Sequence, residues 1–256
     1  MKWIPIIALV ACSSSSSSDE RLSRLEAKLG KITAALDQSL GPAAPDPTQT
    51  YAIPVGDDDP VEGPRDAKIT IVEAFEFLCP YCYLADPVVE QVRAKYGDDV
   101  RVVAKYVVIH GAPAITAGTY ACSAAKQGKY GEMRKALWEH LFTLDNGQPR
   151  QHTDQVANLA EVASSIGVDP DKVARDAESC KAWISHSQRE LAEFGVHKTP
   201  TFFVNGRPLP ERSLQAFDKL IAEELAKVDH SSVARADYYA KEVVGKGLRT
   251  VKSRFD

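Results

Sequence analysis

The sequence predicts an α/β domain that is interrupted by a helical insertion and preceded by a separate heptad helix. Strand-like segments rich in β-branched residues at 67–77 and 100–109 enclose a helix-like segment that begins at Cys79. Residues 112–194 show apolar side chains at helical spacing, with glycine or proline where each segment stops. Residues 22–36 repeat leucine and isoleucine in the heptad pattern.

The composition is that of an ordinary soluble globular protein. The 256 residues are 44% hydrophobic and 26% charged, with a formal net charge of −4. A chain of this length can form one large domain or two small ones. The charges show no strong asymmetry of sign, so nothing indicates nucleic acid as a partner.

The first twelve residues are typical of a compact secretory signal. Lys2 precedes an apolar run from Trp3 to Ala11 that is too short to span a bilayer. The run ends in Ala11-Cys12, which resembles the bacterial lipobox and predicts that Cys12 is lipidated. The protein would then be periplasmic and lipid-anchored, and Ser13 after the cysteine favours the outer membrane over the inner membrane. The alternative is an ordinary signal peptide with a coincidental cysteine.

A heptad seam follows a serine tether. The seam residues are spaced three and four apart, and opposite charges at Arg21 and Glu26 fall at the g and e positions, where parallel chains pair. We therefore expect a homo-oligomer formed through residues 22–36, either a dimer or a trimer. The alternative is one amphipathic helix that lies on the globular domain or on lipid. The seam consists of Leu22, Leu25, Leu29, Ile32 and Leu36.

The Cys-x-x-Cys motif lies where an apolar strand runs into a helix. Pro80 fits the first helical position, and the unpaired N–H groups and dipole of a helix N-terminus stabilise a thiolate. We expect Cys79 to be the exposed nucleophile and Cys82 the buried thiol that resolves a mixed disulfide. The alternatives are that the motif supplies two ligands of a zinc site, or that it has only a structural role. Zinc needs about four ligands, and the chain has no second such pair, so redox chemistry without metal is favoured.

Three stretches resemble one known family. Residues 71–92 look like the active-site strand and helix of the DsbA-type thioredoxin-fold proteins, and residues 195–209 resemble their cis-proline loop and hairpin. Residues 117–142 are similar to the start of the family's inserted helical domain. The resemblance extends over about residues 51–228 and implies a thioredoxin fold with an inserted all-helical domain.

The resemblance also implies roles for residues outside the cysteine pair. Thr199 and a cis Pro200 should face the pair and bind the substrate chain like a strand, together with Pro80 and Tyr81. An ordinary trans turn proline is the alternative. Lys198 stands where the family often has glycine.

Two cysteines remain after the anchor and the redox pair. Cys122 and Cys180 both fall in the helical insert, where some members of the family have similar pairs. In an oxidising compartment such thiols are usually bonded, so we expect a structural disulfide between them. Two buried free thiols are the alternative.

An acidic residue lies inside the strand that leads to Cys79. Glu73 shares a face with the apolar side chains of that strand, and a buried carboxylate is costly unless it has a task. It also stands where the family has its buried acid. We expect burial to raise its pKa so that it passes protons to and from Cys82. A glutamate that reaches solvent at the strand end is the alternative, and Glu76, on the opposite parity, is expected at the rim.

The chain is expected to divide into seven parts, with a short edge strand at 51–55. These parts are a lipoprotein signal peptide at 1–12, a serine tether at 13–18, a heptad helix at 19–40, a proline-rich linker at 41–50, a thioredoxin-fold domain at 51–111 and 195–230, a helical insert at 112–194, and a helical tail at 231–256.

The resemblance and the motifs together predict a membrane-tethered thiol:disulfide oxidoreductase that exchanges disulfides with exported cysteine-containing proteins. No metal or organic cofactor is expected, since the sulfur atoms carry the electrons. The heptad favours an oligomeric isomerase or reductase that behaves like DsbC or DsbG, recharged by a DsbD-type membrane partner. The alternatives are a monomeric oxidase recharged by a DsbB- or VKOR-type partner, and a non-catalytic chaperone or assembly scaffold.

Overall fold

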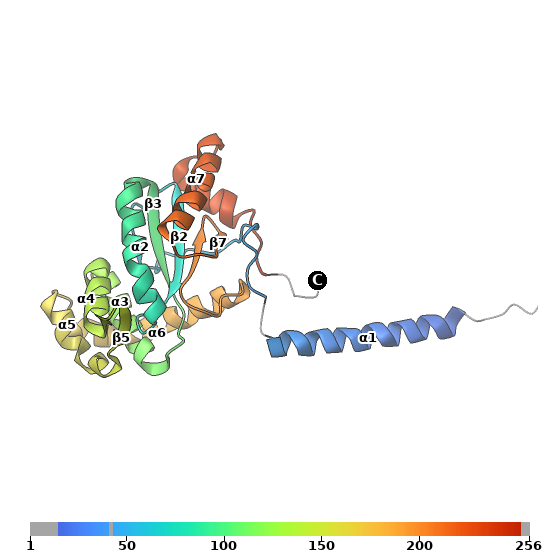
Figure 1. Cartoon of the computed structure of the whole chain (residues 1–256), viewed down its shortest axis with the longest axis horizontal. Helices are drawn as coiled ribbons and strands as arrows, with labels where there is room; N and C mark the ends of the chain where they lie inside the picture. Colours follow the sequence, from blue (N-terminus) through green and yellow to red (C-terminus); the bar gives the residue numbers. More distant parts are fainter. Residues whose placement is uncertain (1–14, 41–42, 252–256) are drawn as a thin grey trace, which may run out of the picture. The chain divides into compact units, whose positions relative to one another are not determined.

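The computed structural model describes residues 15–40 and 43–251, which fall into two units (Figure 1). One unit holds the N-terminal helix, and the other spans Ala44–Val251. The predicted signal segment and Cys12 lie outside the described residues. No helix in the described ranges is long and apolar enough to cross a membrane.

The N-terminal unit is one helix, α1 (Ser15–Leu40). A helix at the predicted heptad is therefore observed, but it starts inside the stretch predicted to be a flexible tether. A helix that is already nucleated extends at little cost through serines, whose helix propensity is only moderately poor. Leu22, Leu25, Leu29 and Ile32 are each more than half exposed, between 56% and 62%. The apolar seam is thus uncovered at these positions in the single chain.

The larger unit is built on a five-stranded mixed sheet in the order β1-β3-β2-β6-β7. The central strand β2 runs parallel to β3 and antiparallel to β6, and all seven of its residues are buried, as predicted for a strand covered on both faces. The strands are β1 (Val61–Glu62), β2 (Ile69–Phe75), β3 (Val100–Tyr106), β6 (Thr201–Val204) and β7 (Arg207–Leu209).

Helices cover both faces of this sheet. Ile71 of β2 packs in one cluster with Val89 of α2 (Pro80–Tyr96) and Phe217 of α7 (Leu214–His230). On the other face, Val72 packs with Leu191, at the end of the long helix α6 (Pro170–Glu193). The confirmed architecture is a thioredoxin fold with a helical insertion, and the cysteine pair lies at the start of α2.

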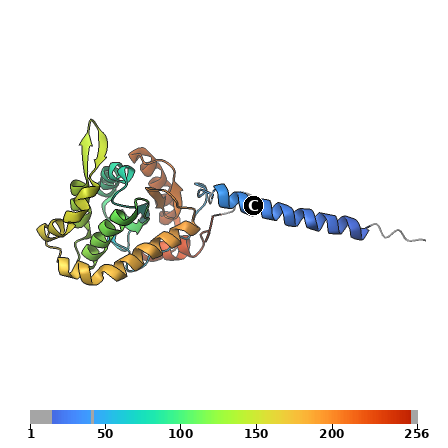
Figure 2. The same ribbon diagram turned by 90° about the horizontal axis from the view of Figure 1, so that it is seen from below.

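The insertion is helical apart from one short hairpin. Asn146 and Gly147 both have positive φ, as a two-residue hairpin turn requires, and the hairpin projects from the insert in Figure 2. The prediction of an all-helical insert is therefore wrong here, because it did not take account of the Asn-Gly turn signal. The elements of the insert are α3 (Gly111–Lys126), α4 (Tyr130–Leu141), β4 (Phe142–Asp145), β5 (Gln148–Gln151), η2 (Thr153–Asn158), α5 (Leu159–Ser165) and α6 (Pro170–Glu193).

The predicted edge strand at 51–55 does not form. Tyr51 makes only an isolated bridge to Leu248, and the segment is buried against the C-terminal part of the chain instead. The hydroxyl of Tyr239 donates to the carbonyl of Ile53 at 2.8 Å. This tail comprises α8 (Arg235–Tyr238) and a π-helical turn, η3 (Tyr239–Val244).

A disulfide joins two helices of the insertion, and the hydroxyl of Tyr106 links the insertion to the sheet. Cys122 in α3 and Cys180 in α6 form a disulfide. The hydroxyl of Tyr106, at the end of β3, accepts a hydrogen bond from the N–H of Phe77 at 3.1 Å and donates to the carbonyl of Ala114 in α3 at 2.8 Å. The segment that leads to Cys79 is thereby held against the first helix of the insert.

Candidate active site

Cys79 is the residue from which α2 starts. Its backbone is extended (φ −87°, ψ 116°), Pro80 is the first helical residue, and the carbonyl of Cys79 accepts hydrogen bonds from the N–H groups of Cys82 at 3.0 Å and Tyr83 at 3.1 Å. Both thiols are free. The sulfur of Cys79 therefore lies where a helix N-terminus favours negative charge.

Cys79 is not exposed as predicted. The residue is only 3% exposed because the loop before β6 covers it, and its Sγ lies 3.5 Å from the carbonyl oxygen of Thr199. Cys82, one turn into the helix, is completely buried, as expected of the resolving thiol.

The two thiols have opposite acidities. The pKa of Cys79 is lowered to about 6, first by a hydrogen bond from the Cys82 thiol and then by hydrogen bonds from Thr199 and from backbone N–H groups, with burial acting against them. The pKa of Cys82 is raised well above its ordinary value, first by burial and then by its hydrogen bond to Cys79 and the charge there. At neutral pH one sulfur is a thiolate and the other a thiol, which is the arrangement that disulfide exchange needs.

The loop opposite the cysteines contains a cis peptide bond between Thr199 and Pro200. Although Thr199 is 120 positions from Cys79, the two are in contact. Proline has no N–H, and the carbonyl of Thr199 on the same loop faces the sulfur of Cys79. The loop thus presents backbone to any chain that approaches the sulfur.

A groove of about 430 Å³ runs from this loop along the body of the protein. Tyr81, Thr199 and Pro200, three of the residues predicted to bind substrate, line it, whereas Pro80 is not among its lining residues. Tyr81 is 62% exposed, and the guanidinium of Arg212 lies 5.6 Å from its ring centroid. The groove is thus built next to the Cys-x-x-Cys motif from segments that are far apart in the sequence.

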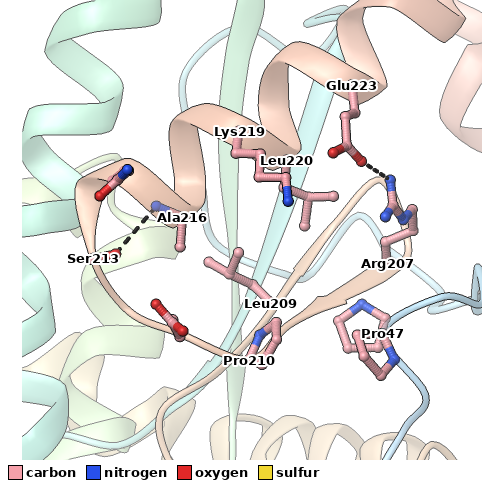
Figure 3. Close-up of a pocket in the computed structure, with 12 residues that line it drawn as sticks. Pro47, Arg207, Leu209, Pro210, Ser213, Ala216, Lys219, Leu220 and Glu223 are labelled. Atoms are coloured by element: carbon pink, nitrogen blue, oxygen red, sulfur yellow. Dashed lines mark hydrogen bonds and ion pairs between the residues drawn. The ribbon is translucent and has the colours of Figure 1, made fainter.

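A second hollow of about 450 Å³ continues beyond the edge strand β7 (Figure 3). Pro47, Leu209 and Pro210 belong to the walls of both hollows. Of the two cations that line this hollow, Arg207 and Lys219, Arg207 pairs with Glu223 at 2.8 Å, the contact dashed in Figure 3.

A buried guanidinium lies beneath the cysteine helix. Arg134 of α4 is 3% exposed and donates to both oxygens of Glu73, at 2.9 and 3.3 Å. It also binds Asp86 of α2 at 2.7 Å, and Asp86 accepts a further hydrogen bond from the indole of Trp138 at 2.8 Å. Strand, cysteine helix and insert therefore meet at one charged group.

Glu73 is completely buried, and burial raises its pKa in spite of the opposing charge of Arg134. Its charge in turn contributes to the raised pKa of Cys82. This placement is compatible with proton exchange between the two groups. Arg134 itself was missed from the sequence, because nothing in a helix pattern shows which strand its polar residue will meet.

The prediction for a second acidic residue near the cysteines is wrong. Glu76 was expected at the rim, but it is completely buried. The reason is that β2 ends at Phe75, so the alternation of faces does not extend to residue 76. One of its carboxylate oxygens contacts Nδ1 of His110, and the other is buried without a hydrogen-bond partner. Burial raises its pKa.

His110 is partly exposed, with 39% of its side chain accessible. The pair therefore leads from the buried surroundings of Cys79, whose charge affects the pKa of Glu76, to solvent. A buried carboxyl with an exposed histidine partner can hand a proton to water. Over residues 15–40 and 43–251, no group of three or more His, Cys, Asp or Glu side chains is arranged to hold a metal ion.

Comparison with known proteins identifies the family and the fold. A family model described as Thioredoxin matches residues 56–223. A thioredoxin-like oxidoreductase from Silicibacter pomeroyi DSS-3 is 25% identical, with a TM-score of 0.55 over 69% of this chain and 95% of that chain. Oxidised BdbD from Bacillus subtilis shares the fold, with 20% identity and a TM-score of 0.58 over 73% of this chain and 100% of that chain.

The curated relatives are much longer proteins. The Na(+)/H(+) antiporter NhaA of Herminiimonas arsenicoxydans is 36% identical over 155 residues, which are 59% of this chain and 23% of the relative. The chain thus spans about a quarter of the length of the curated relatives it matches.

The ultraviolet absorbance of the thiolate in the reduced protein should titrate with a midpoint near pH 6, the lowered pKa of Cys79. Lowering the pH through this value protonates the sulfur and removes the absorbance, whereas an ordinary thiol loses it at about pH 8.5. Cys79→Ser should abolish the transition. A midpoint near that of an ordinary thiol would contradict the proposed stabilisation of the thiolate.

Arg134→Met should lower the free energy of unfolding by roughly 3–5 kcal/mol, because Glu73 and Asp86 lose their buried counter-charge. Urea unfolding followed by circular dichroism measures this. The matched control is Lys135→Met, since Lys135 is exposed on the same helix, and it should change stability by less than about 0.5 kcal/mol. Equal losses in both variants would show that the ion network does not stabilise the fold.

Proposed function

This chain belongs to the Thioredoxin family, and on that premise we propose that it is a thiol:disulfide oxidoreductase acting on exported cysteine-containing proteins. One observation carries the proposal. The acidic sulfur of Cys79 lies at the start of α2, 3.5 Å from Thr199 in a cis-proline loop, with the buried thiol of Cys82 donating to it. The similarity to an oxidoreductase at 25% identity supports the same class.

The reaction uses only the two sulfur atoms. The thiolate of Cys79 attacks a substrate disulfide, forms a mixed disulfide and releases one substrate thiolate, which takes up a proton. Cys82 then loses its proton and attacks the sulfur of Cys79, which releases the second substrate thiolate. The substrate gains two electrons, and the protein gains an internal disulfide. The same steps in reverse oxidise a substrate.

The proton of Cys82 needs a route, because this thiol has no access to water. Glu73 is the acceptor that we propose, since it is buried, has a raised pKa and lies close enough to Cys82 for its charge to raise the pKa of that thiol. Glu76 with His110 offers the exit to solvent. Thr199, Pro200, Pro80 and Tyr81 bind the substrate chain in this proposal, and no metal or organic cofactor takes part.

The exposed seam of α1 favours an oligomeric isomerase or reductase over a monomeric oxidase. Four apolar side chains more than half exposed would be covered by another copy of the helix. We propose that the protein is periplasmic and lipid-anchored at Cys12. The outer membrane is favoured over the inner membrane. A DsbD-type membrane partner would keep it reduced, whereas a DsbB- or VKOR-type partner would serve an oxidase.

Trapping of the mixed disulfide tests the reaction. Cys82→Ser should accumulate a substrate joined to Cys79, visible on a non-reducing gel and lost on reduction, because nothing remains to resolve it. Cys79→Ser should abolish trapping and refolding of a scrambled-disulfide protein. If the refolding activity survives Cys79→Ser, the protein is instead a non-catalytic chaperone or scaffold.

A charged side chain introduced into the seam tests whether the seam forms an oligomer. Leu29→Glu should convert the oligomer to a monomer in light scattering, and should remove isomerisation of a scrambled-disulfide protein while leaving oxidation of a reduced one. Ala27→Glu, which adds the same charge off the seam, is the control and should keep both properties. A wild-type chain that is already monomeric, and that oxidises but does not isomerise, would identify a tethered oxidase.

A further inference from the structure

The groove beside Cys79 carries positive charge that nothing on its walls balances. Lys198 and Arg212 are the charged residues among its lining side chains, and no carboxylate lines it. Both side chains are exposed, and neither Lys198 nor Arg212 forms an ion pair within the described part of the chain. The protein as a whole is acidic, with a net charge of −4, so this local excess is opposite in sign to the rest.

Both cations belong to residues that adjoin the cysteine pair or contact a residue inside it. Lys198 is bonded to Thr199, whose carbonyl oxygen is 3.5 Å from Sγ of Cys79. Arg212 is stacked over the ring of Tyr81, inside the Cys-x-x-Cys motif, with its guanidinium carbon 5.6 Å from the ring centroid. The lysine therefore flanks the groove on the loop side, and the arginine on the helix side.

Two carboxylates adjoin the segments that line the groove, but neither lines it. Asp46 stands between two groove-lining prolines but is not itself a lining residue, and its Oδ1 is bound to the N–H and the hydroxyl of Thr48, both at 2.8 Å, rather than to Lys198 or Arg212. Glu211 precedes Arg212 and lines the neighbouring hollow, where Arg207 is already neutralised by Glu223. The positive charge thus remains available to a bound chain.

We propose that Lys198 and Arg212 form an anion subsite, which selects substrate cysteines flanked by aspartate or glutamate in an extended segment. This inference rests on the proposed function and names its substrate class. Charge complementarity increases the rate of encounter and orients the peptide along the groove, and both effects weaken as salt screens the charges.

Three synthetic peptides of equal length test the subsite. Each has one cysteine joined in a mixed disulfide to thionitrobenzoate, and the flanking residues are Asp and Glu, Asn and Gln, or Lys. The reduced full-length protein attacks the peptide sulfur through Cys79, the bond to thionitrobenzoate breaks, and the coloured thiolate leaves with the electron pair. Cys82 then loses its proton and displaces the peptide thiol. Stopped-flow absorbance gives the second-order rate constant.

The acidic peptide should react about tenfold faster than its amide counterpart at low ionic strength, and about twofold faster in about 0.5 M salt. Lys198→Gln and Arg212→Gln should each reduce this ratio, and the double variant should bring it to about one. The charge reversal Lys198→Glu should favour the lysine peptide. Lys172→Gln and Arg189→Gln, which remove the same charges from exposed positions on α6, should leave the ratio unchanged.

The outcomes separate the two proposals. Equal rate constants for all three peptides with the wild-type protein would overturn the subsite and leave the oxidoreductase activity standing. A preference for the lysine peptide, or a ratio that falls equally in the α6 variants, would also overturn it. No release of thionitrobenzoate from any peptide would overturn the proposed function, and the subsite with it.

Discussion

The guanidinium of Arg134 lies out of contact with water, between the carboxylates of Glu73 and Asp86. Burying an ion costs several kcal/mol unless its partners are held in good geometry, so the three groups constrain one another. They come from the central strand, the helix that begins at Cys79, and the insert. The position of the insert over the cysteine helix therefore depends on this contact. The contact also bears on the pKa of Cys82, because the charge of Glu73 raises it.

The difference between the two sulfur atoms follows from where this framework places them. Cys79 ends an extended segment at a helix N-terminus and accepts several hydrogen bonds, which stabilise negative charge. Cys82 lies one turn further, where burial opposes charge. Identical side chains three positions apart thus receive opposite properties from their surroundings. Neither property would survive in an isolated peptide, which has no buried interior.

The sequence predicted what local spacing encodes. The cysteine pair and the doubly buried strand were visible because motif and periodicity are short-range features, whereas the role of the proline at 200 came from the resemblance to a known family. Arg134 was not visible, since its partner is 61 positions away and a helical pattern does not identify it. Glu76 was misplaced by a parity argument carried one residue beyond the end of β2. The burial of Cys79 depends on a loop that is 120 positions away and therefore could not be predicted locally.

The proline-rich stretch before the sheet has a part in the groove, because Pro45 and Pro47 belong to its walls. A tether is usually free to change in length and composition, since only its span matters. Here, substitutions or deletions in this stretch would also reshape the surface that meets the substrate. Under the proposed function, drift in the sequence of this stretch and substrate preference are therefore coupled, and homologues in which the stretch differs in length are expected to differ in what they bind.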